Sequence, residues 1–186
     1  MNSILPFDEL NKFKIDLQER FPDKKLIING NDFEDVIDWM LDLFLLAYAR
    51  GVDITGERLG KPWKPTIDDV DKTVNKKVAG KTWRERAEEY FSNGGTVDDL
   101  IRIAETETHR DANEAALGAA RNAGMKSKTW VTMLDEKVRD THQYLEGMTV
   151  GIDEDFWTYD NDHAPAPGMF DYAENNVNCR CELLFS

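Results

Sequence analysis

The sequence predicts an α+β protein, in which a helical N-terminal part is followed by a long helix and a small, mainly antiparallel sheet. Apolar residues in the first half of the chain recur at helical spacing. After Gly124, short segments rich in β-forming residues are separated by turn residues. We therefore divide the chain into a helical region, residues 1–95, and an α+β region, residues 96–186.

The first strong helical pattern follows the candidate cap residues Asn31 and Asp32 and ends at Gly51. Its apolar stripe includes Phe33, Met40, Phe44 and Tyr48. Further leucines make the stripe broader than one small core needs, so the helix is either fully buried or partly a docking surface for a partner protein. The glycines and prolines of residues 51–66 predict a loop after it.

Three helix starts then carry a capping-box pattern, in which a threonine hydroxyl and a carboxylate three residues later bond to each other's backbone N–H groups. The pairs are Thr66 with Asp69, Thr82 with Glu85, and Thr96 with Asp99. The third pair opens the long helix, residues 97–123, and Gly124 closes it. Beyond it we expect a strand at 128–134, a short helix at 135–147, short strands at 148–152 and 156–159, a proline-rich loop at 163–168 and a terminal strand at 179–185.

Composition narrows the class of protein. The chain has 186 residues, a formal net charge of −13 and 41% hydrophobic residues, which is enough for a core but unlike an autonomous nucleic-acid binder. The longest apolar run is interrupted by Asp42 and is shorter than the roughly 20 residues that a bilayer span needs. The first residues lack the pattern of a secretory signal. We therefore expect a soluble protein that stays in a cytosol or is assembled into a particle there.

The long helix carries a first group of polar residues. Glu107 and Asp111 stand four residues apart, and Arg110 stands three residues from Glu107. These side chains form either a solvated edge with surface ion pairs or an organised, partly buried polar cluster. His109, on the same helix, and His163, in the proline-rich loop, are expected to be exposed to solvent.

A second group combines the short helix with the end of the chain. Arg139 and His142 lie on one helix face, with His142 on its apolar side, where a structural polar network is the commoner arrangement. Imidazole and thiolate also suit zinc. The candidate ligands are His142, Cys179, Cys181 and Asp135. A disulfide within Cys-x-Cys is disfavoured, and alternating geometry would place both sulfurs on one face with Arg180 on the other.

An enzyme is the less favoured alternative. Cys179 or Cys181 next to His142 would be a nucleophile pair, and a toxin-like enzyme would use Glu107 and Arg139 with His142 in one cleft. The sequence supplies no glycine-rich phosphate loop and no serine nucleophile elbow.

The ordered residues of the second half resemble the phage Mu F-type minor head, or head morphogenesis, protein family. The matching order is Trp130, Asp135, Arg139, His142, Leu145, Gly147, Val150, Phe156, the loop Pro165 to Gly168 and the terminal Asn-Cys-Arg-Cys. The stretch "ETETHRDANEAA" is similar to the helix that precedes this block in the family, with Glu107, Arg110 and Asn113 at matching positions. The resemblance covers about residues 100–185.

This resemblance implies a structural component of a phage or prophage head, placed near the portal vertex and acting in head assembly, DNA packaging or DNA delivery. The implied partners are the portal protein and the major capsid protein, with neither sequence-specific nucleic acid nor a membrane involved. No cofactor is implied, and zinc is the one alternative. The candidate structural or functional cluster is Glu107, Arg110, Asp135, Arg139, His142, Cys179, Arg180 and Cys181. The same domain resembles modules in bacterial toxin-like proteins, which keeps the enzyme alternative open.

Overall fold

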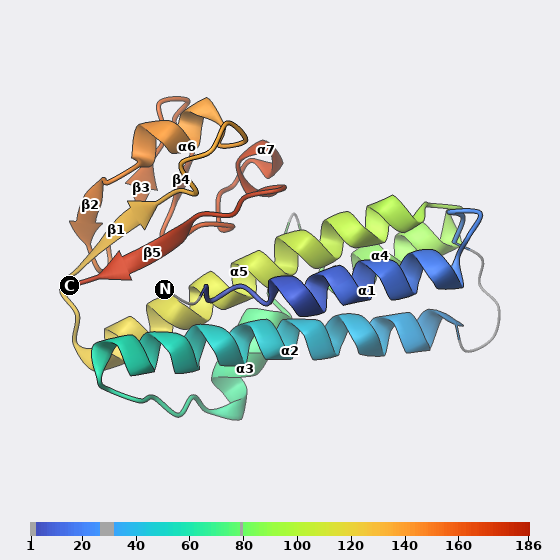
Figure 1. Ribbon diagram of the computed structural model, residues 1–186, viewed down its shortest axis with the longest axis horizontal. Coiled ribbons are helices and arrows are strands. Elements are labelled where there is room, and N and C mark those ends of the chain that lie inside the picture. Colours follow the sequence, from blue (N-terminus) through green and yellow to red (C-terminus); the bar gives the residue numbers. More distant parts are fainter. Residues whose placement is uncertain (1–2, 27–31, 79) are drawn as a thin grey trace.

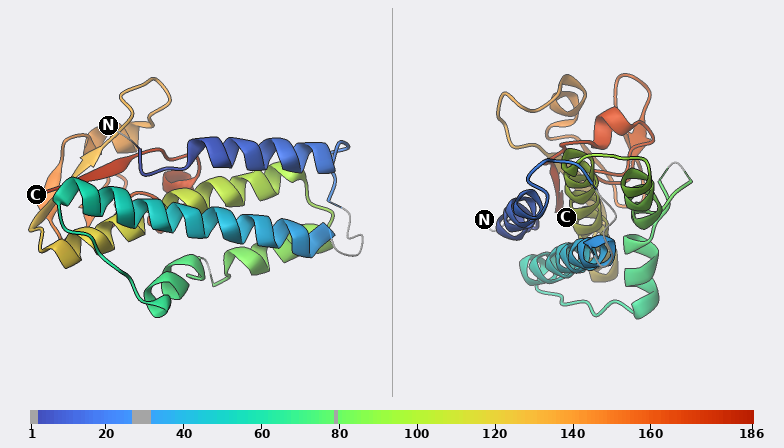
Figure 2. Two further views of the ribbon diagram at one scale, coloured as in Figure 1. Left: turned by 60° about the horizontal axis from the view of Figure 1, so that its bottom comes forward. Right: turned by 90° about the vertical axis from the view of Figure 1, so that its right-hand side faces the viewer.

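The helices form a bundle around one central member. The computed structural model describes residues 3–26, 32–78 and 80–186. Helices α1 (Phe7–Arg20), α2 (Asp32–Leu59) and α5 (Val97–Ala123) run side by side, and the shorter α3 (Ile67–Val74) and α4 (Trp83–Ser92) pack against them (Figure 1). Seen from the end of the bundle, α5 lies near the centre, with the other helices on three sides and the strands on the fourth (Figure 2). The central position of α5 brings both halves of the chain onto one helix.

The strands form two small antiparallel units. In the larger sheet, β1 (Ser127–Val131) lies between β2 (Thr149–Gly151) and β5 (Glu182–Phe185). The smaller unit pairs β3 (Phe156–Trp157) with β4 (His163–Ala164). Two short helices, α6 (Asp140–Leu145) and α7 (Ala173–Asn176), complete this part of the chain. The predicted α+β class is confirmed.

Local signals in the sequence placed the helix ends well. All three predicted capping boxes are present, with the threonine hydroxyl and the carboxylate each bonded to a backbone N–H. The long helix runs from Val97 to Ala123, and Gly124 follows it in the left-handed conformation with φ of 79°. These features depend only on residues within one turn of the helix end, so the sequence is sufficient to predict them.

The prediction that α2 ends at Gly51 is wrong, because the helix continues to Leu59 and only residues 60–66 form the loop. Gly51 is instead a contact point between helices. A Cβ atom at this position would lie 2.3 Å from the carbonyl oxygen of Ala112 in α5. The glycine therefore permits close packing inside a helix rather than ending it. Helix α2 begins at Asp32, and Asn31 lies outside the described residues.

Five predicted elements of the second half are shorter than expected. The strands predicted at 128–134, 148–152 and 156–159 are β1, β2 and β3, each at least two residues shorter, and the short helix and the terminal strand begin late. The terminal strand begins at Glu182 rather than Cys179, since Asn178 has a left-handed φ of 57° that interrupts extended backbone just before the first cysteine. The short helix begins at Asp140, because the carboxylate of Asp135 accepts a bond of 3.1 Å from the N–H of Lys137 and holds a turn instead. The proline-rich loop contains β4.

The two largest apolar clusters of the described residues share α5. The core of the helical bundle includes Phe44 and Trp83, whose rings meet edge to face at 5.1 Å. The second core surrounds Trp130 in the sheet. Leu100 of α5 contributes to the first core and Leu117 to the second. The division of the chain at residue 95 stays a prediction, because α5 packs with the elements on both sides of it.

The proposed docking stripe on α2 lies inside the bundle. Met40 and Phe44 are fully buried and Tyr48 is 4% exposed. Phe33 packs against the same core and meets Phe91 edge to face at 5.1 Å. The docking alternative is therefore wrong for these side chains, since α2 is covered by neighbouring helices along this face.

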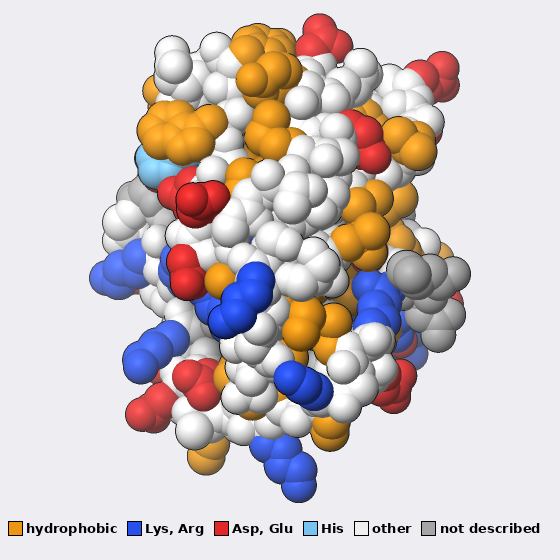
Figure 3. Space-filling view, turned by 90° about the vertical axis from the view of Figure 1, so that its left-hand side faces the viewer, with side chains coloured by type: hydrophobic (Ala, Val, Ile, Leu, Met, Phe, Trp, Pro, Cys, Tyr) orange, Lys and Arg blue, Asp and Glu red, His pale blue; other side chains and the backbone are white. Residues whose placement is uncertain are grey.

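Aromatic side chains are exposed elsewhere, near the sheet. Trp157, Tyr159 and Tyr144 are each more than half exposed, and Trp157 stacks on His163 at 4.4 Å. Figure 3 shows hydrophobic side chains gathered in the upper half of the face at the sheet end of the molecule, with a histidine beside them.

Among the described residues, no helix combines the length and apolar character that a bilayer span requires.

Candidate functional site

His142, Cys179 and Cys181 converge in the core of the sheet region. The sulfur of each cysteine lies 3.5 Å from Nδ1 of His142, and all three side chains are buried. His142 reaches this position from the first turn of α6, and the two cysteines from the segment just before β5. The one-residue spacing directs both sulfurs to the same side, as the alternation of extended backbone predicts.

Asp135 and Arg180 lie outside this group. The two guanidinium nitrogens of Arg180 donate to the two carboxylate oxygens of Asp135 at 2.8 and 2.9 Å, on the exposed side of the segment. This pairing lowers the pKa of Asp135, with the Arg180 hydrogen bond as the main cause. Asp135 is therefore positioned as an anchor for Arg180 and does not join the His142 group.

Aromatic rings enclose the imidazole of His142. Phe170 stacks on it at 5.5 Å, and Trp130 meets it edge to face at 5.3 Å. Nε2 of His142 is buried without a hydrogen-bond partner among the described residues. The orientation of the His142 ring is thus set by its packing against Phe170 and Trp130 and by the two sulfurs near Nδ1.

The two thiols influence each other's ionisation. Burial opposes ionisation of Cys179, but hydrogen bonds from Cys181 outweigh it and lower the pKa of the Cys179 thiol. The hydrogen bond to Cys179, together with burial, raises the pKa of the Cys181 thiol. The two thiols therefore differ in how readily they ionise, and Cys179 is the more acidic of the two.

His109 was expected at the surface and is instead buried at 3% exposure. Its Nε2 donates to the carbonyl oxygen of Cys181 at 2.8 Å, and the amide of Asn113 donates to the same oxygen at 3.3 Å. Burial lowers the pKa of His109, so its ring is neutral at neutral pH. These two bonds fix the Cys-x-Cys segment to α5.

Gly168 makes the approach of the proline-rich loop to α5 possible. Its φ is 83°, and a Cβ atom there would lie 2.9 Å from Nδ1 of His109 and 3.1 Å from Cα of Arg110. The sequence signal that points to a buried His109 is the run of short side chains in α5, such as Ala112 and Ala115. Such a helix can be packed on every side.

The polar residues of α5 form a buried ion-pair network. Of the two alternatives, a solvated edge and an organised polar cluster, the structure therefore shows the cluster. Glu107, Arg110 and Asp111 are each at most 2% exposed. Arg110 pairs with Glu107, and its Nη2 lies 2.9 Å from Oδ1 of Asp111 and donates to the carbonyl oxygen of Thr73 at 3.0 Å. Arg86 of α4 pairs with the other side of Glu107. Burial raises the pKa of Asp111 to about 8.

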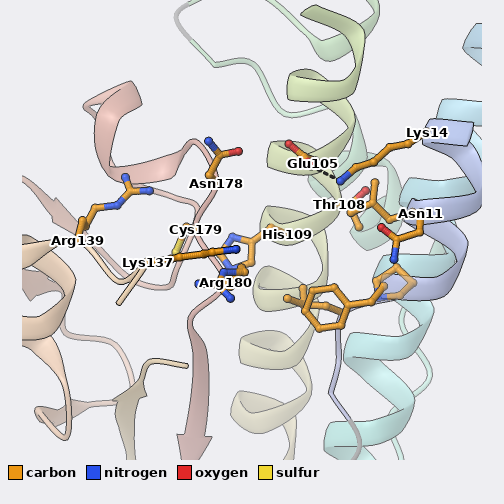
Figure 4. Close-up of a pocket in the computed structure, with 14 residues that line it drawn as sticks. Asn11, Lys14, Glu105, Thr108, His109, Lys137, Arg139, Asn178, Cys179 and Arg180 are labelled. Atoms are coloured by element: carbon orange, nitrogen blue, oxygen red, sulfur yellow. Dashed lines mark ion pairs between the residues drawn. The ribbon is translucent and has the colours of Figure 1, made fainter. Parts of the chain in front are cut away.

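Arg139 lines a separate cavity. Its guanidinium donates to the carbonyl of Val177, and the residue precedes α6. The cavity, of about 600 Å³, lies between α1 and the Cys-x-Cys segment. Figure 4 shows Lys137, Arg139 and Cys179 on one side of it and the Lys14–Glu105 ion pair on the other.

The residues of the enzyme alternative do not share one cleft. Glu107 borders a different cavity, of about 290 Å³, between α4 and the loop at Met169. Arg139 and His142 border a third, much smaller space beside Cys179. Glu107 is therefore separated from the other two residues of that proposed set.

Fold and site together define a class of protein: a helical bundle whose central helix holds a buried ion-pair network and receives a small antiparallel sheet, closed by a C-terminal Cys-x-Cys against a buried histidine. Residues 66–184 match the family described as "Phage Mu protein F like protein", and the chain belongs to that family, as the resemblance predicted. The match contains every member of the predicted cluster.

Two curated relatives are similar to parts of the chain. The NAD(+)--arginine ADP-ribosyltransferase EFV of Enterococcus faecalis is 31% identical over 143 residues, which cover 70% of this chain and 29% of that protein. The minor head protein GP7 of Bacillus phage SPP1 is 33% identical over 85 residues, or 44% of this chain and 28% of that protein. The chain thus spans less than a third of the length of either relative. No solved structure matches it significantly.

Proposed function

We propose that this chain is a minor head protein, built into a phage or prophage head beside the portal, where it acts in head assembly, DNA packaging or DNA delivery. The observation that carries this proposal is the family match over residues 66–184, supported by the similarity to a phage minor head protein. The implied partners are the portal protein and the major capsid protein, and the implied location is the virion.

The burial and pairing of the polar residues support a structural role. The ionisable groups of α5 pair with one another inside the bundle, and Nε2 of His109 donates to a backbone carbonyl. A reacting group must reach its substrate, whereas these groups hold helices and strands together. The net charge of −13 also disfavours unspecific binding to packaged DNA.

The test is the protein content of purified heads. Mature heads and DNA-free heads, analysed by mass spectrometry, should both contain the chain at a constant ratio to the portal protein. Cross-linking should join it to the portal. Heads assembled without portal protein are the control and should lack the chain. Its absence from all portal-containing heads would refute the head assignment, and equal amounts in heads without portal would refute the portal contact.

An enzyme is the second candidate, because an ADP-ribosyltransferase is among the relatives. This candidate requires the chain to transfer ADP-ribose from NAD⁺ to arginine or to arrest bacterial growth. We expect neither, since Glu107 does not meet Arg139 and His142 in one cleft. Incorporation of labelled ADP-ribose by the purified chain, or growth arrest that disappears in Glu107→Gln, would support the enzyme instead.

A further inference from the structure

We propose that His142, Cys179 and Cys181 bind a zinc ion, which ties the C-terminal segment of the chain to α6. The three ligand atoms lie within 4.8 Å of one another and belong to buried side chains. The group lies in the core of the sheet region, apart from the ion-pair network of α5. This site goes beyond the proposed head function and does not depend on it.

The distances match those of a tetrahedral zinc shell. Zinc bonds of about 2.3 Å to sulfur and about 2.0 Å to nitrogen place a ligating nitrogen and sulfur about 3.5 Å apart in a tetrahedron. Both sulfur-to-Nδ1 distances are 3.5 Å. A zinc ion would therefore fit between the three atoms with small adjustments of the side chains.

Hydrogen bonding alone explains the arrangement of these three side chains less well than a bound cation does. The Nδ1 atom of an imidazole has either one lone pair or one hydrogen, so it forms one good hydrogen bond. Here two sulfurs are directed at the same nitrogen at equal distance. A cation between the three atoms satisfies all of them at once, and two thiolates balance its charge.

The surroundings provide a fourth position and a route of entry. A space of about 10 Å³ adjoins His142, Cys179 and Cys181, which is about the volume that one water needs. Three protein ligands plus water form an accepted zinc shell. Cys179 also borders the cavity of about 600 Å³, through which an ion would reach the site from solvent. Asp135 is not needed as a ligand, since it pairs with Arg180.

The first experiment measures metal in the full chain purified from zinc-supplemented cells and dialysed against metal-free buffer. We expect near one zinc per chain. Cys179→Ser, Cys181→Ser and His142→Asn should each weaken zinc binding beyond the roughly 10–100-fold typical of losing an outer-sphere partner. His163→Asn, which changes a histidine outside the group, is the matched control and should keep the metal. Substoichiometric zinc in folded wild-type protein would overturn the proposal.

A spectroscopic experiment covers the case in which the ligand variants do not fold. Cobalt(II) added to apo wild-type chain should give thiolate-to-cobalt charge-transfer bands and the intense visible bands of a tetrahedral site, both at one equivalent. Zinc should displace the cobalt and remove these bands. A spectrum typical of octahedral cobalt without sulfur ligands would contradict the site and leave a packed His-Cys-Cys core as the answer.

Discussion

Arg110 is a charged side chain held in the interior of the bundle. It is 2% exposed, and its guanidinium is shared among Glu107, Asp111 and the carbonyl oxygen of Thr73. Removing a buried charge from its water shell is costly unless its partners are arranged around it. The main contribution of Arg110 to stability is therefore that it compensates the acidic side chains that are buried around it.

We expect Arg110→Met to lower the free energy of unfolding by about 3–5 kcal/mol, because it leaves the buried side chain of Asp111 without its cation and the buried side chain of Glu107 with Arg86 alone. Urea unfolding followed by circular dichroism measures this change. Arg121→Met, on the same helix but in an exposed pair with Asp153, is the control and should cost at most about 1 kcal/mol. Equal small losses in both variants would show that the network contributes no more than a surface pair.

The raised pKa of Asp111 predicts a pH dependence of stability. Burial raises this pKa from an ordinary value of 3.8 to about 8. Between these values the folded state holds a proton that the unfolded chain releases, so the free energy of unfolding falls as pH rises from about 4 to about 8. Asp111→Asn removes this proton and should flatten that part of the curve, as measured by urea unfolding at several pH values. Parallel curves for wild type and variant would contradict the raised pKa.

At the scale of elements, the contact between α2 and α5 determines how the bundle is built. Short side chains line it, including Ala47 on α2 and Ala112 and Ala116 on α5, and Gly51 faces the backbone of α5. Short side chains allow two helix backbones to approach closely. This is why α2 continues through a glycine that local rules place at a helix end.

The close contact predicts a reversal of an ordinary trend. Replacing glycine by alanine inside a helix normally stabilises it by about 1 kcal/mol. Gly51→Ala should instead destabilise the protein by about 1–3 kcal/mol, because its Cβ would overlap the carbonyl oxygen of Ala112. Thermal and urea unfolding measure the difference. Gly118→Ala is the control and should cost less, because its Cβ would lie 2.9 Å from the side chain of Trp63, which can shift more easily than the backbone of α5. A gain of stability in Gly51→Ala would refute the close packing.

At the scale of the whole molecule, α5 makes the helical bundle and the sheet depend on each other. It contributes to the cores of both, and its residues hold the Cys-x-Cys segment through the carbonyl oxygen of Cys181. Elements that share a central helix lose their packing when that helix unfolds. The two regions predicted from the sequence are therefore expected to unfold as one unit.

We expect one cooperative transition in urea, with the same midpoint for the helical far-ultraviolet signal and for the near-ultraviolet signal of the packed tryptophans. Leu183→Ala, in β5, should lower both midpoints equally, with a loss of about 2–5 kcal/mol. An unchanged helical midpoint in this variant would mean that the two regions are independent domains, divided near residue 95.

Much of the fold was predictable from the sequence because it depends on short segments. The capping threonines, Gly124 and the alternation of Cys179 and Cys181 act through neighbours a few residues away, and the structure shows each of them. The α+β class and the family followed from the order of such segments. Part of the candidate site was also predictable, since His142 faces the two sulfurs.

The tertiary structure alone decided which polar residues are buried and with which partners. The burial of His109, the enclosure of Glu107 by Arg86 and the pairing of Asp135 with Arg180 join segments far apart in the chain. Helical periodicity identifies one apolar face, but no residue of α5 from 103 to 120 is exposed, so the polar residues of this stretch are buried or partly buried as well. Burial depends on the packing of the whole molecule, which no local pattern in the sequence records.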